Sequence, residues 1–513
     1  MGVGNQMKRK CLAVGIILLF VGTSIIPAMA QKTAKSLPTS QGNNIYVDDD
    51  NTEGPWDGTL EHPFQHIMDA VGALADEDTI FVFNGMYNED INLRYFEDLN
   101  FTLTGENKVS TIINGTVDVR YTTIRFRIND FSIREYLLIG AFGWTNDIIV
   151  EDNIFVNGGI IIDDSYGNII KNNTFYTKPI LLMYTKNNVI SNNTFYSGGI
   201  LFGSFYGKYN WDSHTIENNT INNKPIRYYK NTSGVIVRED TGQLILAGCD
   251  NCTVQNLDIS NVDSGIQMAY SSSNHIVNCQ IHNGSSNATD NLFYYAGIKC
   301  HISNYNTIEY TTITKFNYGI KCSQTKYNSI SHCSISHCDK GIDLSISSYE
   351  EISQNNISYN NQGIDCTYDP YNINIKGNVI THNAEGILFG NNAGIGHSNI
   401  TMNSFISNEN GLSIFLCFFI SVKCNNFINN KRDAYFVFSV TSWWRNYWEQ
   451  PRILPHVIVG RSLKYLILDA IYILLWLRYP DNHFPEPPAP KEIIWFNIDW
   501  RPALKPYDIP GLS

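Results

Sequence analysis

Charged side chains are scarce in this chain, and no long segment shows the periodicity of an amphipathic helix. Only 16% of the 513 residues are charged, whereas 43% are hydrophobic, and Asn, Ser, Thr, Ile and Tyr recur throughout. These features favour strands joined by polar turns. A basic surface is also missing, because the formal net charge is -12. No nucleic acid partner is therefore expected.

Long apolar runs are missing except in two places. The first, residues 11–26, follows the basic residues 8–10 and precedes Ala28-Met29-Ala30. This order predicts a signal peptide over residues 1–30, cleaved near Ala30, and hence a secreted or cell-surface protein. An uncleaved anchor is the alternative, although about 16 apolar residues are marginal for crossing a bilayer.

The second apolar run, residues 463–478, is too short to span a membrane. Asp469 interrupts it, and Lys464 and Arg478 bracket it. We expect it to pack within a terminal cap, with attachment to a membrane or a partner as the alternative.

The cysteines do not predict a disulfide framework, because a chain of this length can bury a large core without one. A cluster of cysteine and histidine at 322–338 raises the question of a metal centre; its members are Cys322, His332, Cys333, His337 and Cys338. Cys249 and Cys252 are better candidates for a disulfide or a metal, since only two residues separate them.

A repeated Gly-Ile or Gly-Leu unit with a period near 22 residues organises the chain. The intervals are 22, 22, 22, 23 and 25 along Gly297, Gly319, Gly341, Gly363, Gly386 and Gly411. A second column, mostly asparagine, runs in step: Asn153, Asn173, Asn193, Asn219, Leu257, Cys279, Thr311, Cys333, Asn355, Asn378, Asn403 and Asn425. Short strand-like runs at this period predict a parallel β-helix. Buried amides at one bend can then bond from coil to coil.

The predicted fold is all-β, a single-stranded right-handed parallel β-helix of about 12 coils of about 22 residues. A short helix near 64–75 would close one end, and an irregular segment rich in Trp and Pro would close the other. The expected divisions are a linker at 31–44, the N-terminal cap and first coils at 45–140, the repeats at 141–430 and the C-terminal cap at 431–513.

This register changes how the cysteine and histidine cluster is interpreted. Cys322 falls in an inward column that Leu344 shares, and Cys333 replaces an asparagine, so both are expected in the core. His332 should point away from the core, and His337 and Cys338 fall in a turn. Because these directions diverge, a metal site is not expected there.

Two groups of residues are candidates for ligand binding. An outward column carries Lys299, Lys321, Asp343 and Asp365, which could serve polysaccharide lysis or hydrolysis or form a solvated charge ladder of little energetic weight. Two expected loops, at 220–256 and 283–294, carry aromatic residues suited to stacking on sugars: Tyr228, Tyr229, Phe293, Tyr294 and Tyr295.

Three segments carry a resemblance to a known family. "IYVDDDNTEGPWDGTLEHPFQHIMDAV" resembles an entry segment, "GQLILAGCDNCTVQNLDIS" a coil, and "NYWEQPRILP" with "WFNIDWRPALKPYDI" a tail of exported right-handed parallel β-helix repeat proteins, including the NosD-like group. The pectate-lyase-like scaffold that this resemblance implies hosts lyases, hydrolases, epimerases and non-enzymes. The NosD name implies a link to copper-enzyme maturation, although no cluster of His and Met accompanies the repeat.

We therefore expect a monomeric surface protein that binds polysaccharide or another envelope component without catalysis and without a cofactor. The first alternative is a carbohydrate-active enzyme, a polysaccharide lyase or hydrolase on acidic glycans, for which calcium is the candidate cofactor. The second is a purely structural or adhesive protein.

Overall fold

The computed structural model describes residues 42–142, 145–203, 207–238, 240–284, 295–390, 397–451, 453–463 and 492–509. The predicted signal peptide, Phe293, Tyr294 and residues 464–478 lie outside these ranges. Within them, no helix is both long and apolar enough to cross a membrane.

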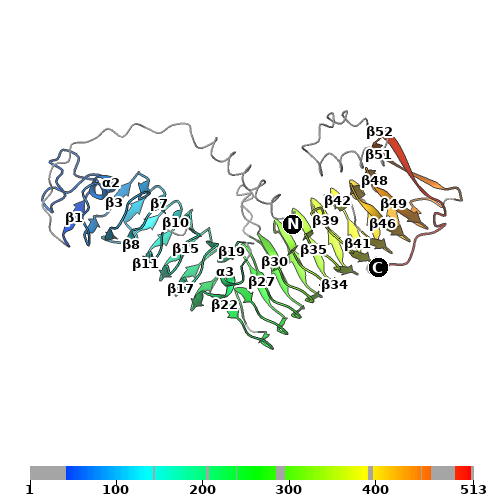
Figure 1. Ribbon diagram of the computed structural model, residues 1–513, viewed down its shortest axis with the longest axis horizontal. Helices are drawn as coiled ribbons and strands as arrows, with labels where there is room; N and C mark the ends of the chain where they lie inside the picture. Colours follow the sequence, from blue (N-terminus) through cyan, green and yellow to red (C-terminus); the bar gives the residue numbers. More distant parts are fainter. Residues whose placement is uncertain are drawn as a thin grey trace, which may run out of the picture. The chain divides into compact units, whose positions relative to one another are not determined.

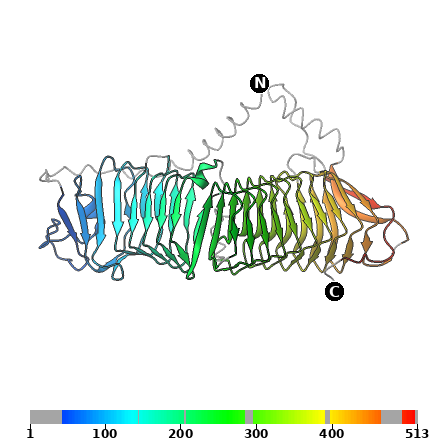
Figure 2. The same ribbon diagram turned by 90° about the horizontal axis from the view of Figure 1, so that it is seen from below.

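The chain folds as a right-handed parallel β-helix, as the repeat predicts (Figures 1 and 2). One sheet runs through eight strands from β1 (Asn44–Val47) to β20 (Thr215–Glu217). A second runs through six, from β4 (Ile91–Asn92) to β19 (Ile200–Phe202), and a third through nine, from β26 (Asp258–Ser260) to β50 (Tyr447–Trp448). Four strands of the first sheet lie in coils before the one that contains Asn153, so the helix has about 16 turns rather than 12.

The face that carries the predicted charge column is a row of parallel strands. They are β22 (Lys224–Lys230), β24 (Gln243–Ala247), β27 (Ile266–Ala269), β30 (Ala296–His301), β33 (Tyr318–Ser323), β36 (Lys340–Ser345), β39 (Gln362–Cys366), β42 (Glu385–Gly390), β45 (Asn410–Phe415) and β48 (Arg432–Val437). Ile298, Ile320 and Ile342 pair in register inside the coil and are fully buried. Burying one isoleucine per coil in a continuous interior stack stabilises the repeat.

The repeated glycine is required by the close approach of neighbouring coils. A Cβ on Gly341 would lie 2.5 Å from the carbonyl oxygen of Gly363. No side chain larger than hydrogen fits such a gap without displacing backbone.

The asparagine column forms the predicted hydrogen-bonded ladder. The backbone N–H of Asn355 donates to Asn378 Oδ1 at 2.9 Å, and Asn378 in turn donates to Asn403 Oδ1 at 2.9 Å. The side-chain amide of Asn378 also donates to the carbonyl of Ile352 at 2.9 Å. Each buried amide is thus satisfied by its neighbours.

The N-terminal end is closed by a helix shorter than the sequence suggests, α2 (Ile67–Val71). Its buried residues Ile67, Ala70 and Val71 cover the first coil. The carboxylate of Glu89 accepts from the backbone N–H groups of Ile67 at 2.8 Å and Met68 at 3.0 Å. An anionic cap from the next coil therefore starts the helix.

The C-terminal end is closed by an antiparallel hairpin of β51 (His456–Leu463) and β52 (Glu492–Asp499). Asp499 is fully buried at the end of the asparagine ladder. Its Oδ2 accepts from the backbone of Asn446 at 2.8 Å, and its Oδ1 accepts from the backbone of Arg445 at 3.0 Å. One aspartate from the returning chain thus ends the ladder.

The segment expected to loop out at 220–256 instead starts a second stack of coils. β21 (Thr220–Ile221) turns into β22 as an antiparallel hairpin, with Asn222 and Asn223 both at positive φ, which suits a two-residue turn. β22 then pairs in parallel with β24, and β23 (Ile236–Val237) with β25 (Thr253–Gln255). The longer interval therefore holds strands, not a recognition loop.

Candidate functional site

The predicted charge column lies in register along one sheet face, but it is buried. Lys299 pairs with Lys321, Lys321 with Asp343, and Asp343 with Asp365. All four residues are nearly inaccessible to solvent. The expectation of a solvated charge ladder is therefore wrong.

Lys299 belongs to the junction between the two stacks. Its Nζ donates to the carbonyl oxygen of Phe202 in the edge strand β19 at 2.6 Å and lies 5.7 Å from the centre of the Trp211 ring. Burial, together with the charge of Lys321, lowers its pKa to about 7. Gln243 and Gln267 bond other backbone groups of the same edge. Lys299 therefore stabilises the junction between the two stacks and does not face a ligand.

The other three residues of the charge column, Lys321, Asp343 and Asp365, form an ion network with Lys340. Lys321 Nζ lies 2.9 Å from Asp343 Oδ1, and Lys340 Nζ lies 3.3 Å from Asp343 Oδ2. Lys340 also pairs with Asp365. Burial alone would lower the pKa of Lys340, but the bond to Asp365 and the charge of Asp343 raise it above its ordinary value. A lysine that holds its proton this firmly is a poor general base.

A polar hollow of about 450 Å³ lies beside this network. Tyr318, Tyr368 and His301 line it with Lys321 and Lys340. The Lys321 ammonium sits 4.3 Å from the centre of the Tyr318 ring. The hollow offers phenol and imidazole groups for proton transfer, but its charges largely neutralise one another.

Three of the aromatic residues expected to stack on sugars are described, and all three are buried or partly buried: Tyr228, Tyr229 and Tyr295. The Tyr228 hydroxyl donates to the carbonyl of Trp211 at 2.5 Å, and burial, followed by nearby acidic groups, raises its pKa. Tyr229 is partly buried against the core. Tyr295 is only 4% exposed and packs against Leu181 and Leu201. These positions favour packing roles over sugar contact.

The predicted disulfide is absent, since Cys249 and Cys252 are both free and buried. They occupy two inward positions of one coil corner, and their thiols donate to different carbonyl oxygens, those of Ala247 at 3.7 Å and Asp250 at 3.5 Å. Cys322 and Cys333 lie in the core as expected.

A larger hollow, which sequence reasoning missed, lies where the C-terminal hairpin meets the last coils. Strand β49 (Val440–Trp444) pairs with β46 (Phe418–Lys423), setting Trp444 beside Lys423, and β52 adds to its other side at Asp499. Because side chains alternate along β49, Trp443 is buried while Trp444 faces out. The hollow, here called the tryptophan groove, measures about 680 Å³.

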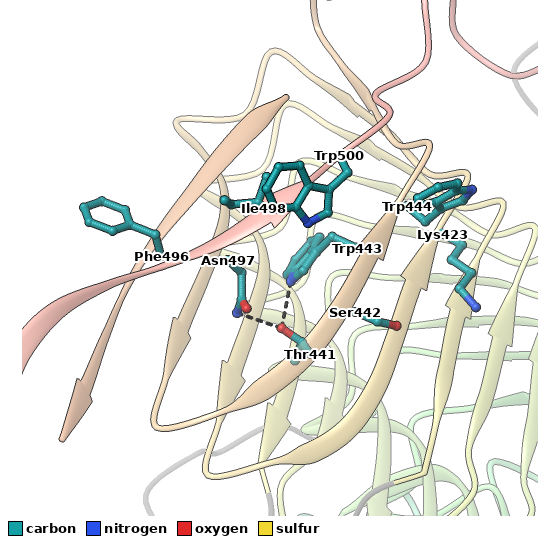
Figure 3. A pocket seen from close by; sticks show the side chains of 9 residues that line it. All are labelled: Lys423, Thr441, Ser442, Trp443, Trp444, Phe496, Asn497, Ile498 and Trp500. Carbon is teal, nitrogen blue, oxygen red and sulfur yellow. Dashed lines mark hydrogen bonds between the residues drawn. The ribbon is translucent and has the colours of Figure 1, made fainter. Parts of the chain in front are cut away.

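Open aromatic faces and fixed polar groups line the tryptophan groove together. Trp500 is 62% exposed and Phe496 52% exposed, and Trp444 is also open to solvent. Thr441 Oγ1 accepts from Trp443 Nε1 at 2.7 Å and from Asn497 Nδ2 at 2.8 Å, which fixes the floor (Figure 3). Figure 3 also shows Phe496 and Lys423 on opposite sides of the hollow. Exposed aromatic residues in a cluster mark a binding surface.

The sequence carried one signal for this groove. "WWRNYWEQPRILP" and "WFNIDWRPALKPYDI" are rich in tryptophan yet lie outside the repeat, where no core column requires large aromatic residues. The two segments meet only through the long-range pairing of β49 with β52, and no period predicts that pairing.

Comparisons with known proteins agree with this fold. The sequence profile of "Periplasmic copper-binding protein (NosD)" matches residues 106–286, 229–367 and 289–464, together more than half of the chain. The chain therefore belongs to the NosD family of parallel β-helix proteins. A search of the curated proteins found no match.

Several solved structures are similar to this chain at low identity. A complex of XylC with xylose is 11% identical, with 81% of this chain and 87% of that chain covered and a TM-score of 0.26. An alginate lyase from Paenibacillus sp. str. FPU-7 is 11% identical, with 79% and 95% covered and a TM-score of 0.24. The mannuronan C-5 epimerase AlgE6 A-module of Azotobacter vinelandii is 11% identical, with 73% and 93% covered and a TM-score of 0.21. At these scores, the fold assignment rests on the geometry described above.

The donor groups of the described residues do not fit copper. Met268, Cys300 and Cys322 occupy successive coils inside the core. A hydrogen bond with Cys300, followed by burial, raises the pKa of Cys322 well above its ordinary value. Throughout the described ranges, no group of three or more His, Cys, Asp or Glu residues is arranged to hold a metal ion.

Proposed function

We propose that this NosD-family protein is an extracytoplasmic carbohydrate-binding protein that binds a polysaccharide chain in the tryptophan groove without cleaving it. The observation that carries the proposal is the gathering of Trp444, Phe496 and Trp500 around one hollow, with polar groups between them. Sugar rings present flat C–H faces that pack on indole, and their hydroxyl groups need hydrogen-bond partners. The tryptophan groove offers both aromatic faces and polar groups.

The wider setting supports binding by the groove. The residues come from β46, β49 and β52, which the coils and the buried Asp499 hold in place. A rigid platform loses little conformational entropy when a ligand binds. The matched family is described as periplasmic, a location where envelope polysaccharides are accessible.

Affinity electrophoresis against a panel of envelope and plant polysaccharides tests the proposal. We expect retardation by at least one polymer and a loss of about tenfold in affinity for Trp500→Ala, because a central tryptophan contributes about 1–2 kcal/mol or more to an interface. Trp56→Ala is the matched control, since Trp56 is 49% exposed in the N-terminal cap. If no polymer is retarded, or if both variants lose affinity equally, the proposal fails.

A second candidate function, lysis of acidic glycans, is favoured by the hollow beside Lys321, Tyr318 and His301. It predicts unsaturated products that absorb in the ultraviolet and that disappear in Lys321→Ala or Asp343→Ala. The neutralised charges of this hollow argue against it, so we expect no such absorbance from the wild-type protein. An ultraviolet absorbance that grows with time and depends on Lys321 would favour catalysis over binding without cleavage as the function of this protein.

A further inference from the structure

The tryptophan groove continues into a second hollow on the far side of Trp444. Trp444 lines both, and the second hollow measures about 770 Å³. Arg445, Arg501 and Lys505 line it, and Asp508 is the one acidic residue among the described residues that line it. The two hollows therefore form one extended surface, the basic extension lying next to the aromatic groove.

The cations of this surface are exposed and available to a ligand. Lys423, Arg445, Arg501 and Lys505 all face solvent, and none of them forms an ion pair with another described residue. Some cations on the coils are instead paired, for example Arg120 with Asp118 at 2.7 Å and Lys171 with Glu151 at 2.7 Å. In a chain with a net charge of -12, four unpaired cations beside one aromatic groove are a local reversal of charge.

We propose that the ligand of the tryptophan groove is an acidic polysaccharide, whose rings stack in the groove while its carboxylates reach the basic extension. This proposal rests on the proposed function and adds the substrate class to it. Arg501 links the two parts, because its guanidinium lies 5.3 Å from the centre of the Trp444 ring. That contact holds a delocalised cation between the tryptophan groove and the basic extension. The carboxylate of a sugar stacked in the groove would project toward this cation.

Charge complementarity selects an acidic chain over a neutral one. Binding a neutral glycan here would leave four cations with only the carboxylate of Asp508 to compensate them, whereas one carboxylate per sugar would reduce their repulsion. The remaining surface of this acidic protein repels such a polymer, so electrostatic attraction would direct the chain to the cap.

Isothermal titration with a matched polymer pair tests this: polygalacturonate and its fully methyl-esterified form, which differ in charge but not in sugar. We expect the acid form to bind at least about fivefold more tightly, since each exposed ion pair contributes 0.2–1 kcal/mol and several can form. Arg445→Gln combined with Lys505→Gln should reduce this preference clearly, because two of the four cations of the surface are then lost.

The control removes two charges elsewhere: Lys315→Gln combined with Lys326→Gln changes exposed lysines on the coils. It should keep the preference for the acid form. Equal affinity for acid and ester, or an undiminished preference for the acid form in Arg445→Gln/Lys505→Gln, would overturn the acidic assignment while leaving glycan binding intact. If neither of the two polymers binds, and no polysaccharide of the wider panel binds either, the proposed function itself is overturned. Comparable affinity for oligo(dT) would overturn the choice of polysaccharide over nucleic acid.

Discussion

At the scale of single residues, a buried carboxylate replaces an amide in a second interior ladder. The backbone N–H of Asn274 donates to Asn306 Oδ1 at 2.9 Å, that of Asn306 to Asn328 Oδ1 at 2.7 Å, and that of Asn328 to Glu350 Oε2 at 3.0 Å. Ile373 occupies the next coil, so Glu350 ends the ladder. Burial, only partly opposed by its bonds to Thr325 and Asn328, raises the pKa of Glu350 to about 7.

This carboxyl group should make stability depend on pH. Because its pKa is higher in the folded chain, the stability linked to its protonation is fully present below pH 4.5 and is lost as pH rises through about 7. Glu350→Gln should remove this dependence, so the difference in unfolding free energy between variant and wild type should grow by about 3 kcal/mol from pH 4.5 to pH 7. Urea unfolding across this range measures it, and parallel pH profiles of the two proteins would contradict the prediction.

Asp499 should be among the most sensitive residues in the C-terminal cap. Asp499→Ala leaves the buried N–H groups of Asn446 and Trp448 without their acceptor, so we expect a loss of about 3 kcal/mol in unfolding free energy. Asp508→Ala, which removes a carboxylate from the rim of the basic extension, is the control and should cost less than about 0.5 kcal/mol. A similar effect of both substitutions in urea unfolding would argue against a ladder-ending role.

At the scale of elements, the period determines the register and therefore could be predicted. The spacing of Gly319 and Gly341 placed Lys321 opposite Asp343, and the strands β33 and β36 show that pairing. The burial of Lys321 and Asp343 could not be predicted in the same way. The period predicts which residues share a column, but it does not predict which other residues cover that column. The hairpin of β21 and β22 was also missed, since its extra length looked like a loop.

The glycine column gives a test of the element scale. Gly341→Ala should destabilise the protein by about 2 kcal/mol, because the new methyl group would press on the Gly363 carbonyl. Gly72→Ala is the matched control, since a Cβ there would have its nearest neighbour at 3.4 Å. Thermal unfolding should separate the melting temperatures of the two variants by about 2 °C, because the unfolding entropy of a chain of this length is large. Equal melting temperatures would contradict the close packing of coils.

For the chain as a whole, the sequence predicted a single β-helix scaffold but not the position of the tryptophan groove on its surface. Repeats explain the coils, the ladders and the isoleucine stack, and all of these are present. The tryptophan groove arises where the repeat ends, from segments more than 50 residues apart that meet through Trp443 and Asp499. Such a site depends on long-range pairing of non-repeating residues.

The most direct test of the central claim is a fluorescence titration of the tryptophan groove with a polysaccharide that retards the protein. If the polysaccharide binds in the tryptophan groove, indole emission should change in a saturable manner for the wild-type protein and for Trp56→Ala, and most of that change should be lost in Trp500→Ala. The same saturable change in Trp500→Ala as in the wild type would show that the polysaccharide binds away from the tryptophan groove.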